Sequence, residues 1–467
     1  MPDHVHAEFA HRSTRTDGVL RRNGAARIAT TLYYCADAAC PQLAGASEQI
    51  MSDTHTLVEN AFRHDYGKVV AALTKRLGPQ HLQAIEDATQ QALLTALTAW
   101  GLGGAPDDRV AWLYRVAYNR ALDVLRRDAK QASVDDAPMQ VAAAHDAPSF
   151  AGEVQDDLLR MMFLCCDPAI PIESQLALAL KTLCGFSTEE IALRLFTSEG
   201  NVLKRLSRAR DVLRESLQLE APALAELLPR LDAVHRVLYL LFNEGYQSAQ
   251  SSDLIRVELC EDALRLTDVL AAHPLTATPE THALLALMYL HGARLQARID
   301  ELGDLVLLAD QDRSRWDLDA IAQGLTWLNR SATGDRMSIY HLLAGIASEH
   351  CLAPTFEATR WQEIAELYQM LERIEPSPLY TMNRAIAVAQ WQGAQAGLDL
   401  LRSVTPPPWL ARYYLWDAVL ADLYLRCGNH QAAAVCYDRA LQHAPTDAER
   451  RLLQRRRDAV AALEPCH

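Results

Sequence analysis

Apolar side chains recur every three or four residues along most of the chain from about residue 55 to 463, which is the period of an amphipathic α-helix. Residues 1–50 show no sustained period. Strand-like alternation is scarce, and the best candidate for a short extended piece is the stretch DLVLLAD at 304–310. The pattern therefore predicts an all-α protein.

Interruptions of this periodicity divide the chain into segments. A chain of 467 residues is too long for one ordinary core, and an aperiodic stretch as long as 130–150 is uncommon inside a compact domain. We expect Met51 to be the biological start, because a clean amphipathic pattern begins there. The predicted organisation is a disordered extension at 1–50, helical domains at 51–130 and 153–217, a flexible acidic linker at 131–152 between them, and a stack of helix pairs at 222–463.

The last segment carries a repeat signal. If Ala440 takes the small position of a 34-residue tetratricopeptide repeat, large, small, aromatic and proline residues fall where that pattern needs them. Such repeats are helix pairs that bury their faces on one another. The matching residues are Leu420, Ala421, Tyr424, Ala433, Tyr437 and Pro445. The sequence thus predicts a solenoid similar to tetratricopeptide repeats.

The segment from Ser187 to Glu215 has the pattern of a helix-turn-helix. Ser187 and Glu190 form a capping box at the start of one short helix, and Ser198 can cap the next. The second helix has one apolar stripe, while an amide and three cations lie on its other side. These are the side chains with which a recognition helix contacts base edges and phosphates. The alternative is a solvated basic face on an ordinary helix. The stripe consists of Val202, Leu206, Ala209 and Leu213, opposite Asn201, Lys204, Arg205 and Arg208.

A second basic helix is predicted at 110–130. Its apolar face contains Tyr114, Tyr118, Ala121 and Leu125, and its other face carries a tryptophan with cations and an amide. Bases of melted DNA can stack on an aromatic ring while cations hold the phosphates. The alternative is that Trp112 anchors the helix to its neighbours. Upstream, the helix that contains AIEDATQQALLTALTAW has Glu86, Asp87, Gln90 and Gln91 on its polar side, which by itself indicates a solvated face.

Composition limits the classes of function. The formal net charge of −14 is unusual for a protein that grips DNA unaided, so any contact with nucleic acid depends on local patches or on a partner. The ten cysteines are scattered without CxxC spacing, which suits a reducing, cytoplasmic setting and predicts neither a metal site nor a disulfide scaffold. There is no long apolar run for a membrane span. No cofactor is expected, and no nucleophile–base pair or phosphate loop indicates an enzyme.

Two charged stretches remain. The cluster LLADQDRSRWD at 307–317 has the carboxylates and arginines of an active site, but ion-paired loops between helices have the same composition more often. The run RRLLQRRRDAV near the end is most simply the solvated face of a capping helix, with contact to a protein partner or DNA as the alternative. We therefore expect structural or partner-binding roles for both.

The order of these elements resembles the sigma-70 family of RNA polymerase initiation factors, in particular the extracytoplasmic-function (ECF) group. The stretch WLYRVAYNRALDVLRR is similar to region 2.3–2.4 of that group, and GFSTEEIALRLFTSEGNVLKRLSRARDVLRE is similar to region 4.2. The later stretches YLLFNEGYQSA and LLALMYLHGARLQARID resemble a subgroup with a long tetratricopeptide-like C-terminal extension. The resemblance covers about 55–463, and in that subgroup the extension is thought to influence sigma activity in cis.

The resemblance implies partners and residue roles. The partners are core RNA polymerase, through its β′ clamp and β flap, promoter DNA and a protein partner of the C-terminal domain. Contacts with the β′ clamp are implied for Asp87 and Gln90, and for Gln91, where family members often have an acid. Contacts with the −10 element and its melted strand are implied for Trp112, Arg115, Asn119, Arg120, Arg126 and Arg127. Contacts with the −35 element are implied for Glu199, Asn201, Lys204, Arg205 and Arg208.

The linker is long enough for this architecture. Promoter elements about 17 base pairs apart are separated by roughly 55–60 Å, and about 25 extended residues reach roughly 80–85 Å. The hypothesis is therefore a sigma factor that directs core polymerase to promoters. The alternatives are a stand-alone helix-turn-helix regulator with a repeat-type sensor domain, which would bind duplex DNA alone, and a purely structural helical adaptor.

Overall fold

A computed structural model gives the arrangement of the helices. It describes residues 65–132, 150–195, 197–216, 228–246, 257–300, 304–334, 336–407, 410, 413–444 and 446–462. These residues form two compact units, one built from the helices between 65 and 216 and the other from those between 228 and 462. The predicted extension at 1–50, the linker residues 133–149 and Pro445 lie outside the described residues.

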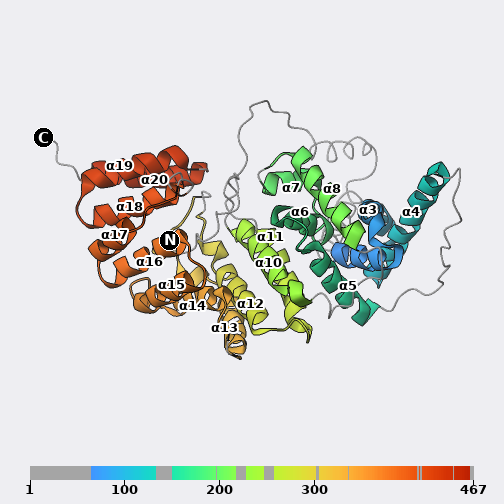
Figure 1. Cartoon of the computed structure of the whole chain (residues 1–467), viewed down its shortest axis with the longest axis horizontal. Coiled ribbons are helices and arrows are strands. Elements are labelled where there is room, and N and C mark those ends of the chain that lie inside the picture. Colours follow the sequence, from blue (N-terminus) through green and yellow to red (C-terminus); the bar gives the residue numbers. More distant parts are fainter. Residues whose placement is uncertain are drawn as a thin grey trace, which may run out of the picture. The chain divides into compact units, whose positions relative to one another are not determined.

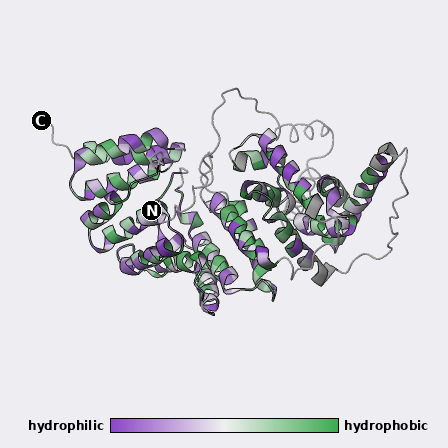
Figure 2. Cartoon of the chain, in the orientation of Figure 1, coloured by the Kyte–Doolittle hydropathy of each residue, from purple (hydrophilic) through white to green (hydrophobic). Residues whose placement is uncertain are grey.

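The first unit is entirely helical over its described residues. It begins with helical residues 65–77. They are followed by η1 (Pro79–His81), α3 (Leu82–Gly103), α4 (Arg109–Ala132), α5 (Phe150–Cys165), α6 (Ile172–Thr182), α7 (Thr188–Arg194) and α8 (Glu199–Ser216). The hydrophobic and hydrophilic sides predicted from the periodicity are visible along these helices (Figure 2).

Small residues allow α3 and α4 to pack closely. Ala92 and Ala96 of α3 and Ala117 and Ala121 of α4 are fully buried, and the two helices lie against each other. A helix pair lined by alanines brings its backbones together without leaving cavities. This packing places the polar sides of α3 and α4 on one surface, where Arg120 of α4 reaches α3.

The second unit is a succession of helix pairs (Figure 1). Adjacent helices in the chain pack on one another, most extensively α12 on α13, α18 on α19 and α10 on α11. The described helices are α10 (Leu231–Tyr246), α11 (Val257–Ala272), α12 (Pro279–Gly292), α13 (Leu318–Ser331), α14 (Ile339–Leu352), α15 (Trp361–Ile374), α16 (Pro378–Trp391), α17 (Ala394–Arg402), α18 (Tyr414–Arg426), α19 (His430–His443) and α20 (Asp447–Ala461), with short 3₁₀ turns η2 (Leu228–Arg230), η3 (Leu295–Ala297) and η4 (Arg313–Arg315).

The predicted repeat residues lie in the core of the α18–α19 pair. Ala421, Ala433, Tyr437 and Ala440 are buried in a cluster against which Leu420 and Tyr424 pack. Fully burying side chains of Leu or Phe size contributes about 1.5–3 kcal/mol each, so this cluster stabilises the end of the stack. The expected helix pair is thus present at the predicted position.

Glycine permits the closest approach between α16 and α17. A Cβ built on Gly397 of α17 would lie 2.5 Å from the carbonyl oxygen of Ala385 and 2.6 Å from the Cβ of Ala389. No side chain fits at that separation, because real Cβ contacts are longer. Gly397 therefore sets the distance between these two helices.

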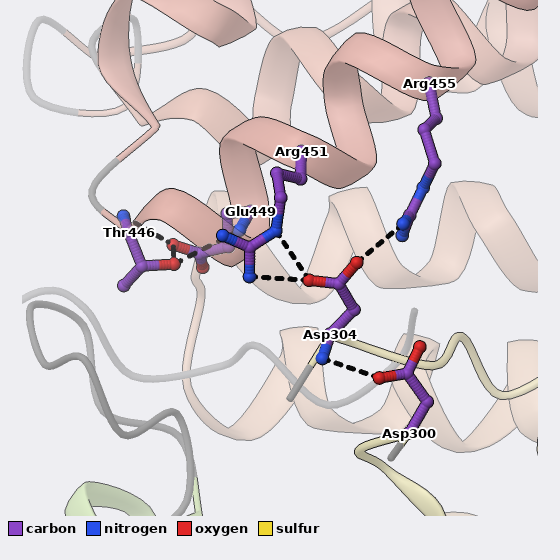
Figure 3. Close-up of polar contacts among 6 residues, drawn as sticks. All are labelled: Asp300, Asp304, Thr446, Glu449, Arg451 and Arg455. Atoms are coloured by element: carbon purple, nitrogen blue, oxygen red, sulfur yellow. Dashed lines mark hydrogen bonds and ion pairs between the residues drawn. The ribbon is translucent and has the colours of Figure 1, made fainter. Parts of the chain in front are cut away.

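The stretch predicted to be extended, 304–310, connects early and late parts of the second unit. Its only regular pairing within the described residues is an isolated bridge between Ile299 and Leu305. Beside this bridge, Asp304 accepts hydrogen bonds from Arg451 and Arg455 of α20, at 2.6–2.7 Å (Figure 3). The last described helix is thereby fastened to a loop that precedes it by about 150 residues in the chain.

The arginine-rich run on α20 is largely exposed, as its interpretation as a solvated face predicts, and several of its cations also make ion pairs within the chain. Besides the pairs with Asp304, Arg456 contacts Asp422 of α18 at 3.0 Å and Arg457 contacts Asp438 of α19 at 3.0 Å. The start of α20 is fixed by the Thr446–Glu449 capping box. These cations hold α20 on its neighbours.

Candidate polymerase and nucleic-acid interface

The helix-turn-helix has the capping geometry expected from the sequence. The backbone N–H of Ser187 donates to Glu190 at 2.7 Å, and the N–H of Glu190 donates to the Ser187 hydroxyl at 3.1 Å. The N–H of Asn201 donates to the hydroxyl of Ser198 at 3.3 Å, which caps α8. Reciprocal caps of this kind fix where a helix begins. Leu195, Thr197 and Ser198 lie between the end of α7 and the start of α8.

The two sides of α8 separate as the periodicity predicts. Its stripe of Val202, Leu206, Ala209 and Leu213 is buried to 1% exposure or less. Of the residues implied in −35 contacts, Glu199, Asn201, Lys204 and Arg208 are exposed and Arg205 is half-buried.

Some of these polar side chains already have partners on the same unit. Glu199 accepts a hydrogen bond from Thr188 at 2.7 Å, and the Asn201 amide donates to Thr197 at 3.2 Å. Arg205 pairs with Glu173 of α6 at 3.3 Å. In the described part of the chain no ion pair is found for Lys204 or Arg208, so these two cations are the most available for phosphate.

The outer face of α4 is cationic. Its tryptophan, Trp112, is half-buried. Trp112 packs edge-on against the buried Trp100 of α3, with ring centroids 5.6 Å apart. The alternative in which Trp112 anchors the helix therefore describes part of its role. Around it, Arg115, Asn119, Arg120, Arg126 and Arg127 are all exposed.

Arg120 links α4 to the polar side of α3. Its guanidinium donates to Gln91 at 3.0 Å and to Thr95 at 2.9 Å. Gln91, implied in polymerase contact, is thus oriented by a residue implied in DNA contact. The third member of the set, Asp87, is exposed, and the Gln90 amide makes a long 3.5 Å hydrogen bond to the carbonyl of Gly185.

Glu86 lies one residue before Asp87, and its interpretation as part of a solvated face is wrong. The side chain is fully buried. It accepts a hydrogen bond from Thr182 of α6 at 2.7 Å and a charge-assisted hydrogen bond from Arg210 of α8. Burial raises the pKa of Glu86, and the positive charge of Arg210 and the Thr182 hydroxyl offset that effect only in part.

Arg210 and Thr182 are the functional candidates that the sequence analysis did not identify. Arg210 is adjacent to the buried stripe of α8 and was not among the cations assigned to its outer face. The one signal for Arg210 in the sequence is its position next to Ala209 of the apolar stripe, away from the exposed cationic side that contains Arg208. A partner 124 residues away cannot be inferred from local periodicity.

The loop at 307–317 has structural contacts. Asp312 caps η4 through the N–H of Ser314, and Asp317 caps α13 through the N–H of Ala320. Arg313 donates to the carbonyls of His350 and Ala353 and lies over the Trp316 ring. Within the described residues no cluster of three metal-ligating side chains is found, and no helix among them is long and apolar enough to span a bilayer.

Three sequence families match consecutive parts of the chain. Residues 62–131 match Sigma-70 region 2, and residues 160–213 match Sigma-70, region 4. Residues 230–332 match a family of unknown function (DUF6596). The first match contains α3 and all but the last residue of α4, the second contains the end of α5 together with α6, α7 and most of α8, and the third lies within the second unit.

Curated proteins similar to this chain fall into two groups. An uncharacterized protein of Rhizobium meliloti (strain 1021) is 33% identical over 393 residues, which cover 82% of this chain and 91% of the relative. The ECF RNA polymerase sigma-E factor of Escherichia coli (strain K12) is 26% identical over 160 residues, covering 33% of this chain and 83% of the relative. The sigma-E factor of Salmonella typhimurium (strain 14028s) is 25% identical over the same length.

No solved structure matches the chain. The match to the first relative extends over both units, whereas the match to the sigma-E factors covers only about a third of this chain. The two sigma-70 regions occur in their family order, on helices that carry the capped helix-turn-helix and the cationic α4. The chain belongs to the sigma-70 family, within its extracytoplasmic-function group, and carries a helical C-terminal extension.

Proposed function

We propose that this protein is a sigma factor that binds core RNA polymerase and directs it to a set of promoters. The observation that carries the proposal is the order of a region 2 match, a region 4 match and their two exposed cationic helix faces. A sigma factor does not need to grip DNA alone, because the core enzyme holds the duplex. The net charge of −14 is compatible with that division of labour.

The residue roles in this proposal follow the family positions. Asp87, Gln90 and Gln91 on α3 contact the β′ clamp, and region 4 contacts the β flap. The exposed face of α4 holds the −10 element, where Arg115 and Asn119 flank the half-buried Trp112. Lys204 and Arg208 on α8 hold phosphates and base edges at the −35 element, and Asn201 and Arg205 join them when their present partners are displaced.

The extension is proposed to act on the same chain. Its helix pairs resemble tetratricopeptide repeats, which often serve as binding surfaces for other proteins. We therefore expect the second unit to modulate sigma activity in cis and to bind a protein partner. A chain that ends at residue 221 should give a different transcription output from the full chain, and equal output would contradict the modulation.

Transcription in vitro tests the main proposal. Core RNA polymerase from the source organism is incubated with its fragmented genomic DNA, with and without the purified protein, and the 5′ ends of the transcripts are mapped. The protein should produce a small set of new start sites preceded by common sequence elements. Lys204→Ala and Arg208→Ala should reduce transcription from these sites, and the double variant should reduce it most.

The stand-alone regulator makes the opposite prediction. A protein of that kind binds duplex DNA tightly in the absence of polymerase and produces no new start sites with the core enzyme. A gel-shift titration of the same genomic fragments, at a stated salt concentration, separates the two hypotheses. Tight binding to duplex without association with core polymerase would overturn the sigma assignment.

A further inference from the structure

A hollow opens in the second unit between two segments that are about 150 residues apart in the chain. One wall is the loop 305–310 and the other is α20. Its volume of about 290 Å³ lies near the lower end of the range for small-molecule sites. Five apolar residues line it, namely Leu305, Val306 and Leu307 from the loop and Leu452 and Ala459 from α20. Three charged residues complete the lining.

The larger apolar side chains of this lining are only partly covered. Leu305, Val306 and Leu307 are consecutive, and all three are half-buried. In an extended segment, successive side chains point to opposite faces, so a segment that lies on a core usually covers alternate side chains. On α20, Leu452 is also half-buried, whereas the neighbouring Leu453 is buried in the cluster of α18 and α19. The hollow therefore presents apolar surface that a ligand can remove from water.

Contacts outside the hollow hold both walls in place. The N–H of Val306 donates to the carbonyl of Arg298 at 2.9 Å, and the Val306 carbonyl accepts from the Gln311 amide at 3.2 Å. On the other wall, Arg451 of α20 donates to Asp304 at 2.7 Å (Figure 3). Because a ligand does not have to order either wall, its binding costs less conformational entropy.

The two cations of the lining retain hydrogen-bond donors for a ligand. A guanidinium carries five N–H donors. Arg455 donates to Asp304 through Nη1 at 2.6 Å, and Arg456 donates to Asp422 through Nη1 at 3.0 Å. About half of the Arg455 side chain is exposed to solvent. The remaining donors of Arg455 can therefore bind a further acceptor.

The charges around the hollow favour an anion on the α20 side. Asp304 is shared by Arg451 and Arg455, at 2.6 Å from each, so one carboxylate serves two cations. The lining itself contains Arg455 and Arg456 against a single carboxylate, Asp310. Asp310 belongs to the loop wall and is exposed. An anionic group of a ligand thus meets cations on α20, and a cationic group meets the acid on the loop.

We propose that this hollow binds a small ligand in which an apolar chain ends in a carboxylate. The chain lies between Leu305 and Leu452, and the carboxylate accepts charge-assisted hydrogen bonds from Arg455 and Arg456. The site lies wholly within the second unit. The inference therefore goes beyond the proposed function and does not depend on it.

Two classes of metabolite share this chemistry. A simple branched or straight-chain carboxylic acid uses the apolar wall and the arginines. An apolar amino acid uses the same groups and adds an ammonium group, which Asp310 can bind. The two sources are distinguished by the effect of Asp310→Asn, which removes the charge of that carboxylate and leaves the rest of the lining intact.

Four probes separate these requirements in the full-length protein. Isocaproate has the apolar chain and the carboxylate, isoamyl alcohol has the chain without charge, acetate has the carboxylate without the chain, and free leucine adds the ammonium group to isocaproate. Ligand-detected NMR gives the dissociation constants. Isocaproate should bind with a constant on the order of 1 mM, and isoamyl alcohol and acetate should bind about tenfold more weakly or less.

Arg455→Met tests the contact with the carboxylate, and Arg451→Met is its matched control. Both arginines bind Asp304 with about half of their side chains exposed, but of the two Arg455 alone lines the hollow. Arg455→Met should weaken isocaproate binding by about tenfold or more, and Arg451→Met should bind like the wild type. Equal weakening in both variants would show that lost fastening of α20 causes the effect, and would overturn the contact.

Ala459→Leu tests the volume of the hollow independently of charge. The larger side chain occupies the space of the ligand, so binding should be lost. Ala461→Leu is the control, because Ala461 is exposed on the same helix and does not belong to the lining. Helical circular dichroism of every variant checks that the fold is retained.

Hydrogen exchange then shows whether the ligand contacts both walls. At about ten times its dissociation constant, isocaproate should slow exchange through opening of the loop 305–310 and of α20 by about tenfold. Tighter binding of leucine than of isocaproate, with the difference abolished by Asp310→Asn, would assign an amino acid, and tighter binding of isocaproate would assign a simple acid. Absence of binding of both, equal binding of isoamyl alcohol, or equal affinity in Ala459→Leu would overturn the site. Transcription is not measured in these assays, so the proposed function is tested separately.

Discussion

Each unit contains a carboxylate that joins segments distant in the sequence. The two carboxylates differ in how much of their partner side chains is exposed to solvent. Glu86 is fully buried and is met by one guanidinium and one hydroxyl. Asp304 is also largely covered, but its partners Arg451 and Arg455 have about half of their side chains in solvent. The pKa of Glu86 is raised by burial, whereas hydrogen bonds from Arg451 and Arg455 lower the pKa of Asp304.

This difference shows that ion pairs between distant segments can contribute to stability in two different ways. In a buried pair, the desolvation of both ions cancels much of their attraction, so the pair adds little net stability but makes the loss of one partner costly. In a pair with exposed cations, removal of the acid leaves arginines that water solvates again. Loss of one partner is therefore expected to be costly at Glu86 and much less costly at Asp304.

The largest effect is expected when one partner of the buried pair is removed. Arg210→Met should weaken the association of regions 2 and 4 by up to about 3–5 kcal/mol, limited by the free energy at which the regions separate and Glu86 regains water. Hydrogen exchange of the backbone amides in α3 and α8 measures this loss. Arg214→Met should stay within about 0.5 kcal/mol of the wild type.

A double variant sharpens this test. Glu86→Gln combined with Arg210→Met replaces the ion pair by neutral side chains of similar size, so the uncompensated charge disappears. Most of the loss seen for Arg210→Met alone should be recovered, because such replacements are often nearly neutral. If the double variant exchanges as fast as the single one, the effect comes from packing and not from the buried carboxylate.

A smaller effect is expected in the second unit. Asp304→Asn removes both ion pairs to α20 while retaining the volume of the side chain and the N–H that bonds Asp300 at 2.8 Å. Two pairs with exposed arginines contribute about 1–2 kcal/mol together, and hydrogen exchange in α20 should speed up accordingly. Asp310→Asn, at an exposed position of the same loop, is the matched control.

Unchanged exchange in the Asp304→Asn variant would mean that apolar contacts alone hold α20. Leu453 and Val460 of this helix are buried and belong to the α18–α19 cluster. In that case the two carboxylates would differ in role as well as in surroundings, and the packing of α20 in the second unit would not depend on charge.

The sequence predicted the features that depend on neighbouring residues. The stripe Val202, Leu206, Ala209 and Leu213 is buried as predicted, and the Ser187–Glu190 capping box is present. The all-α architecture follows from the same periodicity. These features could be predicted because helical period and caps are set within a few residues.

The same reasoning failed where burial depends on a distant segment. Glu86 lies on the polar side of its own helix, and only contact with α6 and α8 removes it from water. Arg451 and Arg455 of α20 keep about half of their side chains in solvent, but their partner Asp304 lies about 150 residues away and could not be inferred from the local pattern. The pattern of apolar residues predicts which side of a helix is polar. It does not predict whether another polar surface of the protein covers that side. The roles of the residues assigned to polymerase and DNA stay predictions.

The pH dependence gives the smallest expected effect and separates the two carboxylates by sign. For Glu86, the raised pKa means that the closed state, in which α3 packs against α6 and α8, binds a proton more tightly than a state in which these helices are separated. Its contribution is therefore greatest below its ordinary pKa of 4.5 and is lost as the pH rises through the raised value. For Asp304, the contribution is present above its ordinary pKa of 3.8 and is lost as the pH falls through the lowered value.

Acidification from pH 7 towards 4.5 should therefore strengthen the closed state of the wild type relative to Glu86→Gln, while the difference between the wild type and Asp304→Asn in α20 stays constant. The groups facing Glu86 are the cations Arg210 and Lys181 and the buried Tyr66, whose pKa is raised mainly by its burial. Hydrogen exchange of α3 and α20 in the same samples records both differences. A closed state that weakens on acidification, by comparison with Glu86→Gln, would show that Arg210 outweighs burial at this site and that the pair is a net source of stability like the one at Asp304.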